Sequence, residues 1–362
     1  MNEFSSCEGL TNEQEWNAVW KEGSIMTVIP IVHCFDSNFV VPAAVAFHSL
    51  LRHAKSLDTL YVLHVIGRDL TEPHRELLRS VVDAFPNAKL EFHEPPAIDP
   101  SLKTGGNFSV DVFFKMAIPD IIKDDIAIVA DVDVIYESDV ADLYHELKPE
   151  EDYWLCGTAD IGYATWRGSG ILKNAGDLKF FRRYSKLIRK EDQKKLVMGV
   201  GFFAMNLKKC REEGATQKWF DFARTNICRI ILPEQDVLNI CSWPKIKIVS
   251  SRYMAIAAYW PDYEKLSEAA KMDNPAWDEM YANPVQIHFA TGIKPWRYPD
   301  SPLAEKWFDA CVAAGMLHRW RIWFGKLTEK QTRFMLARKI IDRAFSIGRR
   351  TFRIVLAREA KR

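Results

Sequence analysis

The chain has 362 residues, of which 48% are hydrophobic and 27% are charged, and its formal net charge is +1. This length suits one large α/β domain with an appendage or two modest domains, and the composition excludes a disordered or repeat protein. The first 16 residues are polar and acidic, unlike a signal peptide, and no run of about 18 apolar residues predicts a membrane span. We therefore expect a globular protein of the cytoplasm.

The seven cysteines are scattered through the chain and include no Cys-x-x-Cys pair. Several lie in apolar runs, where cysteine behaves as a small hydrophobic residue. This usage favours a reducing compartment over a disulfide framework.

The first hundred residues alternate between strand and helix patterns. Apolar runs at 27–35, 59–67 and 89–95 predict strands, and helical spacing within 36–54 and from Thr71 predicts the helices between them. The alternation predicts an α/β fold of GT-A-like (Rossmann-like) type, with a mostly parallel sheet flanked by helices. Ligands bind at the carboxyl ends of the strands in such sheets.

Further along the chain, residues 113–122 predict a helix that closes at or shortly after Pro119. Strands are predicted at 127–136, 154–160, 201–210, 246–254 and 285–290, and an exposed basic helix at 178–195. The proline-rich segment at 299–302 suggests a boundary. We expect a polar extension at 1–24, a catalytic domain at 25–300 and a basic helical region at 301–362.

Two carboxylates interrupt the apolar stretch at 127–136. Alternate residues of a strand point to the same side, so Asp131 and Asp133 should present their carboxylates together. Two unpaired anions are costly to bury, and no Lys or Arg lies nearby in sequence. Such oxygen ligands suit Mg²⁺ or Mn²⁺ and predict a metal that also binds a diphosphate. The alternative is an Asp-x-Asp that merely enters a turn.

A second polar motif follows the last predicted strand. His288 can offer a neutral imidazole to a metal ion, Gly292 lets a phosphate approach the backbone, and Lys294 is a compact positive charge. Such a histidine alone is more often a buried structural residue. Together with the acidic pair, it favours a joint metal and phosphate site.

Five ordered motifs resemble glycosyltransferase family 8. They are FDSNF at 35–39, ADVDVIY at 130–136, NLKKCR at 206–211, EQDVLN at 234–239 and HFATGIKPW at 288–296. The family includes glycogenin and bacterial lipopolysaccharide galactosyl- and glucosyltransferases. The resemblance covers residues 26–296 and implies a retaining enzyme of the GT-A fold. It implies a UDP-sugar donor, Mn²⁺ with Mg²⁺ as the alternative, and a saccharide or lipid-linked saccharide acceptor.

The resemblance also implies roles for residues at matching positions. The uracil and ribose would be held by Cys34, Asp36 and Asn38, and the metal by Asp131, Asp133 and His288. The remaining donor-binding positions are Lys115, Val132, Thr291, Gly292 and Lys294. Asp160 would bind hydroxyl groups of the donor sugar, and Gln235 with Asp236 would lie beside the anomeric carbon.

The chain departs from the family pattern at several of these positions. Gly199-Val200-Gly201 replaces Asn-Ala-Gly, which removes an amide that would reach the sugar. Lys115 replaces Arg, and a guanidinium fork is thereby exchanged for a point charge. Glu234 stands where Asp is usual, and Thr291 where Gly is usual. The donor sugar, galactose or glucose, therefore stays open, whereas the metal ligands are all present.

Two retaining mechanisms stay open at this stage. One uses a carboxylate that forms a covalent intermediate, and the other uses attack by the acceptor on the face that UDP leaves. We favour the second, because the family's position beside the reacting carbon is the amide Gln235. In that mechanism a diphosphate oxygen takes the acceptor's proton while the metal and Lys294 stabilise the leaving group.

The C-terminal residues form a separate electrostatic unit. From Arg319 to Arg362 there are fourteen lysines and arginines and three acidic residues, a balance of +11, so the rest of the chain carries −10. Basic and apolar residues alternate at helical spacing, which is typical of a helix on an anionic membrane surface. The alternatives are packing on the acidic body and nucleic-acid binding. No recognised motif supports nucleic acid.

Two other functions compete with a hexosyltransferase. A catalytically inactive nucleotide-sugar-binding protein would keep the metal site, and the altered Gly199 and Thr291 positions favour it. A phosphotransferase would need a phosphate-binding Gly-rich loop, and neither Gly-x-x-x-x-Gly-Lys-Ser/Thr nor Gly-x-Gly-x-x-Gly is present. We expect the glycosyltransferase, in lipopolysaccharide or other cell-surface glycan synthesis, at the inner face of the membrane.

Overall fold

The structure is a computed structural model that describes residues 27–56, 58–102, 109–160, 198–228, 230, 232–265 and 275–325. At its centre is a seven-stranded sheet in the order β3-β2-β1-β4-β7-β6-β8. Its strands are β1 (Thr27–Asp36), β2 (Thr59–Arg68), β3 (Ala88–His93), β4 (Ile126–Ala130), β6 (Leu155–Ala159), β7 (Met198–Asn206) and β8 (Ile246–Val249). Only β7 is antiparallel to its neighbours in this sheet. The predicted mostly parallel sheet flanked by helices is confirmed.

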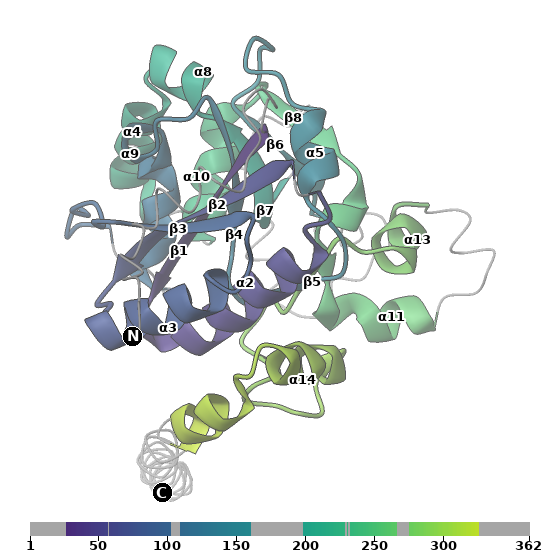
Figure 1. Cartoon of the computed structure of the whole chain (residues 1–362). Coiled ribbons are helices and arrows are strands. Elements are labelled where there is room, and N and C mark those ends of the chain that lie inside the picture. Colours follow the sequence, from purple (N-terminus) through teal and green to yellow (C-terminus); the bar gives the residue numbers. More distant parts are fainter. Residues whose placement is uncertain are drawn as a thin grey trace, which may run out of the picture.

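Helices cover both faces of this sheet (Figure 1). One face packs on α2 (Val40–His53) and α3 (Glu72–Val82). The opposite face packs on η2 (Val110–Ala117), α4 (Ile118–Ile121), α8 (Leu207–Glu212), α9 (Ala215–Asn226) and α10 (Pro233–Ser242). Because both faces are covered, the central strands are apolar on both sides and read as continuous hydrophobic runs.

A smaller sheet has the order β5-β10-β9 and lies beside the carboxyl end of β4. Its strands are β5 (Val134–Tyr136), β9 (Ala255–Ile256) and β10 (Gln286–His288). The short elements around the two sheets are η1 (Ser37–Phe39), α5 (Ala141–His145), η3 (Ser251–Tyr253), η4 (Ala257–Tyr259), α11 (Trp260–Glu264) and α13 (Pro275–Ala282). The chain therefore passes from one sheet to the other between β4 and β5.

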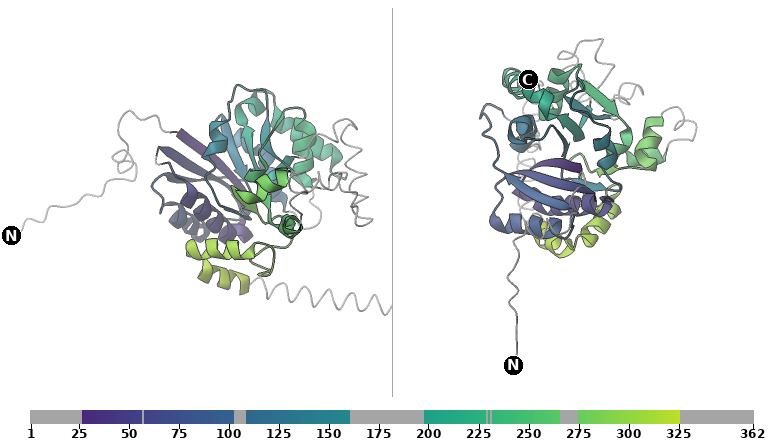
Figure 2. Two further views of the ribbon diagram at one scale, coloured as in Figure 1. Left: turned by 90° about the vertical axis from the view of Figure 1, so that its right-hand side faces the viewer. Right: turned by 45° about the horizontal axis from the view of Figure 1, so that its top comes forward.

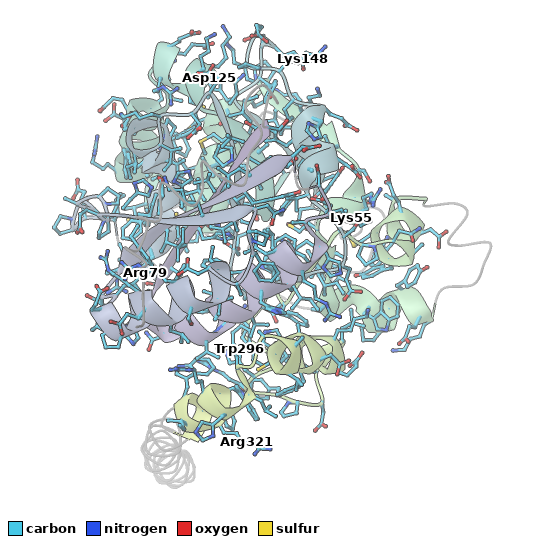
Figure 3. The ribbon with its side chains drawn as sticks, in the orientation of Figure 1. Lys55, Arg79, Asp125, Lys148, Trp296 and Arg321 are labelled. Atoms are coloured by element: carbon cyan, nitrogen blue, oxygen red, sulfur yellow. The ribbon has the colours of Figure 1, made fainter. Side chains whose placement is uncertain are left out.

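The last described elements pack on the outside of α2. Helix α14 (Ala304–Ala313) contacts α2 and β5, and a further helical stretch covers 317–325 (Figure 2). Trp296 is buried between α2 and α14, with its ring centroid 5.3 Å from that of Trp307 (Figure 3). The start of the predicted C-terminal region is thus part of the main hydrophobic core. None of the described helices combines the length and the apolar character that crossing a bilayer requires.

Three predicted strands have different bounds, and a polar side chain caps the turn after two of them. The strand predicted at 201–210 ends at Asn206, whose side chain accepts a hydrogen bond from the backbone N–H of Lys209 and so begins α8. The strand predicted at 246–254 ends at Val249, where Ser250 caps η3. The last predicted strand shortens to β10. In the first two cases, the capped turn ends the strand although the apolar pattern continues.

The strand predicted at 127–136 is wrong in one respect. It divides into β4 and β5, and Asp131, Val132 and Asp133 lie in the link between the two sheets. The helix predicted at 113–122 starts earlier, as the 3-10 helix η2, and ends in α4 at Ile121, just after Pro119. The strand at 154–160 is confirmed as β6. The helix predicted at 178–195 lies outside the described residues.

The described cysteines are free thiols; they are Cys34, Cys156, Cys210, Cys228, Cys241 and Cys311. Burial raises the pKa of Cys156 to about 12, and likewise the pKa values of Cys241 and Cys311 to about 12. At neutral pH these thiols are protonated, and a protonated thiol is a poor nucleophile and metal ligand.

His33 on β1 connects the central sheet to the link between the sheets. Its Nδ1 lies 3.0 Å from the carbonyl oxygen of Ala130, and its ring packs on Phe47 at 4.8 Å between centroids. The side chain is fully buried, and burial lowers the pKa of His33 from 6.5 to about 4. His33 is therefore neutral in the folded protein at neutral pH.

We predict that the free energy of unfolding falls by about 3 kcal/mol as the pH falls from about 6.5 to about 4, because the unfolded chain protonates His33 and the folded chain does not. His33→Asn keeps a donor near Ala130 and should flatten this dependence. Urea unfolding at pH 7 and pH 4 measures it, with the exposed His318→Asn as control. An equally steep dependence in His33→Asn would contradict the assignment.

Candidate active site

The site forms where β4 ends and the smaller sheet begins. Asp131 directly follows β4, and Asp133 directly precedes β5. Strand β10 pairs antiparallel with β5 so that His288 lies opposite Val134. The backbone N–H of Phe289 donates to the carbonyl of Asp133 at 2.9 Å. This pairing brings a residue more than 150 positions away in sequence to the two carboxylates.

The three side chains predicted to bind metal come together. Nε2 of His288 lies 3.6 Å from Oδ2 of Asp131 and 3.2 Å from Oδ1 of Asp133. One ligand atom from each residue falls within 4.8 Å of the other two. Two carboxylate oxygens and one imidazole nitrogen suit a hard divalent cation such as Mn²⁺. The residues present thus fit a metal ion.

Both carboxylates also have a lysine partner, which the sequence pattern did not predict. Nζ of Lys115 lies 2.6 Å from Oδ1 of Asp131, and Nζ of Lys294 contacts Oδ2 of Asp133. Lys294 also donates to the carbonyl of Phe289 at 2.8 Å. Burial would raise the pKa of Asp133, but Lys294 and His288 hold it far below its usual value. Asp133 is therefore ionised at neutral pH.

A buried network continues from Lys115 to the start of α10. Lys115 donates to Glu234 at 3.2 Å and to the carbonyl of Val200 at 3.0 Å. Burial lowers the pKa of Lys115, but Asp131 and Glu234 outweigh this effect and raise it. Burial raises the pKa of Glu234, which Lys115 opposes. Lys115 thus holds together the two elements that carry Asp131 and Gln235.

The predicted sugar-binding residues lie next to each other. Nε2 of Gln235 donates to Oδ2 of Asp160 at 3.2 Å. Asp236 is fully buried, and its carboxylate accepts from the backbone N–H of Leu232 at 3.2 Å, at the start of its own helix. Gln235 and Asp160 share one location, whereas the contact of Asp236 supports the helix end.

The residues predicted to bind the nucleoside lie at the carboxyl end of β1. Oδ1 of Asp36 accepts from the backbone N–H of Asn38 at 2.8 Å, and Arg68 approaches Oδ2 at 3.3 Å. Arg68 also forms a two-point contact with the buried Asp111 on η2, the element that carries Lys115. Cys34 is partly buried on the same strand. Sequence reasoning missed Arg68, although its place at the end of a buried parallel strand was a usable signal.

Thr291 and Gly292 are exposed in the loop that follows β10, and Val132 is buried in the core between the two acids. Thr291 has a φ of +87°, a left-handed conformation that is costly for a β-branched residue. Its Oγ1 accepts from the backbone N–H of Ile293 at 3.2 Å. This strain explains why a glycine is usual at the position, and why threonine there counts as a departure.

Gly201 packs directly on the imidazole of His288. A Cβ at this position would lie 2.3 Å from Nδ1 and from Cε1 of that ring, and the carbonyl of Gly201 accepts from the N–H of Asp131 at 3.0 Å. Only glycine allows β7 to approach this closely. At Gly199, by contrast, a Cβ would meet the flexible end of the buried Met254 side chain. Gly201 therefore belongs to the site, although no local sequence signal marks it.

Comparison with known proteins identifies the family of this chain. A model of glycosyl transferase family 8 matches residues 30–300. The chain belongs to glycosyltransferase family 8. No curated protein sequence gives a significant match.

Solved structures show the same GT-A fold. The galactosyltransferase LgtC, solved with donor and acceptor sugar analogues, matches with a TM-score of 0.61 and 17% identity over 82% of this chain and 100% of its own. The bifunctional glycosyltransferase WbbM matches with a TM-score of 0.63 and 15% identity over 80% of this chain and 50% of its own. GlyE of Streptococcus pneumoniae TIGR4 matches with a TM-score of 0.54 and 19% identity over 84% and 64%. This chain thus spans half of WbbM but all of LgtC.

We predict that Gly201→Ala displaces His288 and weakens Mn²⁺ binding by about 10- to 100-fold, the effect typical of disturbing the support of a metal ligand. Electron paramagnetic resonance of free Mn²⁺ in a titration measures the affinity. Gly325→Ala is the control, because a Cβ there meets nothing within 4 Å. Unchanged Mn²⁺ affinity in a folded Gly201→Ala protein would show that His288 is not a ligand.

Proposed function

We propose that this chain transfers galactose or glucose from a UDP-sugar to a saccharide acceptor, with retention of configuration and with Mn²⁺. Family membership supports glycosyl transfer, and the convergence of Asp131, Asp133, His288 and Lys294 is the observation that carries the proposal. The likeness to LgtC, a galactosyltransferase, favours a hexose donor. Lipopolysaccharide or another cell-surface glycan is the proposed product.

Charge at the site is consistent with binding a cation and a diphosphate together. Asp131, Asp133 and Glu234 contribute three negative charges when ionised, and Lys115 and Lys294 contribute two positive ones, which leaves −1. A divalent cation and the diphosphate of a UDP-sugar, which carries two negative charges, would add no net charge. Transfer of both from water is therefore less costly than transfer of either alone.

Lys294 would stabilise the departing diphosphate. Its ammonium contacts both Asp133 and the carbonyl of Phe289, and its long side chain would let it turn to a diphosphate oxygen on the same side. When bound, a divalent ion held by Asp131, Asp133 and His288 would supply Lewis-acid stabilisation of the departing diphosphate. Lys294 adds a charge-assisted hydrogen bond as negative charge develops there.

Gln235 would stabilise the reacting sugar. Because Asp160 accepts from Nε2, the carbonyl oxygen of the amide is the end left to face positive charge at the anomeric carbon. We propose that the Asp160 carboxylate accepts hydrogen bonds from hydroxyl groups of the donor sugar. We favour attack by the acceptor hydroxyl on the face that UDP leaves, with its proton passing to a diphosphate oxygen. If a covalent intermediate forms instead, Asp160 is the carboxylate beside Gln235.

A screen of UDP-sugars tests the proposal. Purified full-length protein should hydrolyse or transfer one UDP-hexose in the presence of Mn²⁺, and activity should disappear with chelator and return on adding Mn²⁺. The competing proposal is an inactive nucleotide-sugar-binding protein, favoured by the lysine pairing of both acids and by the strained Thr291. Tight UDP-sugar binding without turnover, with or without an acceptor panel, would establish that alternative.

We predict that Gln235→Ala lowers turnover by at least about 100-fold and leaves UDP affinity nearly unchanged, because the amide acts on charge that develops during transfer. Isothermal titration with UDP and initial-rate measurements separate the two effects. Gln217→Ala, on the exposed surface of α9, is the control. A large loss of UDP affinity in Gln235→Ala would show that Gln235 is misplaced.

We also propose that the basic C-terminal region docks on an anionic membrane. A truncation at 301 would remove the buried Trp307, so the matched truncation should begin after Gly325. Full-length protein should co-sediment with vesicles rich in phosphatidylglycerol and lose this binding at high salt, whereas the truncated protein should stay in solution. Equal sedimentation of both proteins would contradict membrane docking by this region.

A further inference from the structure

A second cluster of metal-binding side chains lies at the edge of the main sheet, away from the candidate active site. His64 is on β2, and Glu91 and His93 are on β3, the edge strand. In the parallel pairing of these strands, His64 lies opposite Glu91, and His93 lies two positions further on the same side. Leu63 and Val65 pack with the core under α2 and α3, so the cluster occupies the opposite face.

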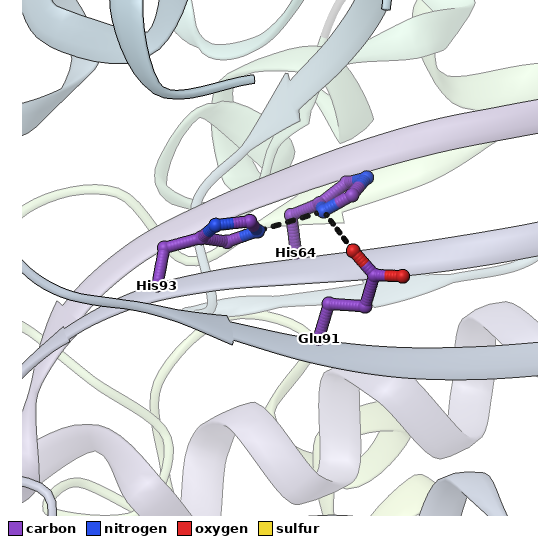
Figure 4. A group of neighbouring side chains, drawn as sticks. All are labelled: His64, Glu91 and His93. Atoms are coloured by element: carbon purple, nitrogen blue, oxygen red, sulfur yellow. Dashed lines mark hydrogen bonds and ion pairs between the residues drawn. The ribbon is translucent and has the colours of Figure 1, made fainter. Parts of the chain in front are cut away.

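The ligand atoms of the cluster converge on one point (Figure 4). Nδ1 of His64 lies 2.9 Å from Nε2 of His93 and 3.4 Å from Oε2 of Glu91. One ligand atom from each residue is within 4.8 Å of the other two. Tetrahedral coordination with bonds of about 2.0–2.1 Å places neighbouring ligand atoms roughly 3.3 Å apart. The observed separations are close to this value before any ion is added.

The surroundings favour neutral imidazoles and an ionised carboxylate. His64 is buried, and burial lowers the pKa values of both His64 and His93, so that their lone pairs are available at neutral pH. Burial opposes ionisation of Glu91, but Lys89 and His64 together hold its pKa below the usual value. Lys89 contacts Oε1 of Glu91 at 2.7 Å and leaves Oε2 directed at the histidines.

We propose that His64, Glu91 and His93 bind a borderline divalent transition-metal ion such as Zn²⁺. Two imidazole nitrogens and one carboxylate oxygen suit zinc, copper, nickel or cobalt better than the oxygen-rich set at Asp131 and Asp133 does. Three protein ligands leave a fourth position for water, and Glu91 is exposed enough to admit it. The ion would join edge strand β3 to β2. This proposal does not rest on the proposed transferase function.

Affinity at this site should be limited by the second nitrogen of His64. Metal binding at Nδ1 moves the imidazole proton to Nε2, which is buried and has no hydrogen-bond partner among the described residues. A ligating histidine usually donates this N–H to an acceptor, and its absence weakens metal binding by about 10- to 100-fold. We therefore expect this site to bind zinc more weakly than a structural zinc site whose ligating histidines all donate their second N–H to an acceptor.

Zinc binding by full-length protein tests the proposal. In an Asp131→Asn/Asp133→Asn background, which removes the other cluster, chelator-stripped protein is dialysed against Zn²⁺ and its metal content is measured. We expect one zinc per chain in this background, and one in the same background with His145→Gln, an exposed histidine control. His93→Gln should bind at least tenfold more weakly. Mn²⁺ should not displace the zinc at equal concentration.

A second variant separates loss of the ligand from loss of the fold. Glu91→Gln keeps the shape of the side chain and should also weaken zinc binding at least tenfold. Zn²⁺ should raise the thermal unfolding midpoint of the background protein but not that of either variant. If the background protein binds no zinc, or if both variants bind it as tightly as the background does, the site does not exist.

Discussion

The structure depends on opposite charges brought together where the chain passes from one sheet to the other. Asp131 and Asp133 lie in a three-residue link. Lys115 reaches them from η2, and His288 and Lys294 reach them from β10 and the loop that follows it. An unpaired carboxylate in this position would carry a desolvation penalty of several kcal/mol. Folding of the link therefore requires these partners, and the same partners define the site.

Ion pairs and hydrogen bonds with the surrounding elements hold this charge cluster in position. Arg68 joins β1 and β2 to η2 through Asp36 and Asp111, and Lys115 on η2 joins Asp131 to the start of α10. The end of α10 nearest the site carries Gln235, which contacts Asp160 after β6. The nucleoside, diphosphate and sugar positions predicted from sequence are thus joined by ion pairs and hydrogen bonds together with the backbone of η2 and α10. A substitution at one of these positions should therefore alter the geometry of the other positions.

The sequence predicted what depends on local pattern. Apolar periodicity was enough to predict the alternation of strands and helices. The ordered motifs were enough to predict that Asp131, Asp133 and His288 lie together. It did not predict the lysine partners, because Lys115 lies 16 residues before Asp131 and Lys294 lies 161 residues after Asp133. The role of Gly201 was not predicted, since its packing on His288 is a tertiary contact. The strand ends at Asn206 and Val249 were missed because the side-chain caps of Asn206 and Ser250 outweighed the apolar pattern.

A crystal structure of the protein with Mn²⁺ and UDP is the most direct test of the central claim. The anomalous signal of manganese locates the ion without reference to the protein chemistry around it. We expect one peak within coordination distance of Asp131, Asp133 and His288, with the diphosphate on the side of Lys294. UDP bound with no manganese between these three side chains, or manganese bound elsewhere on the protein, would contradict it.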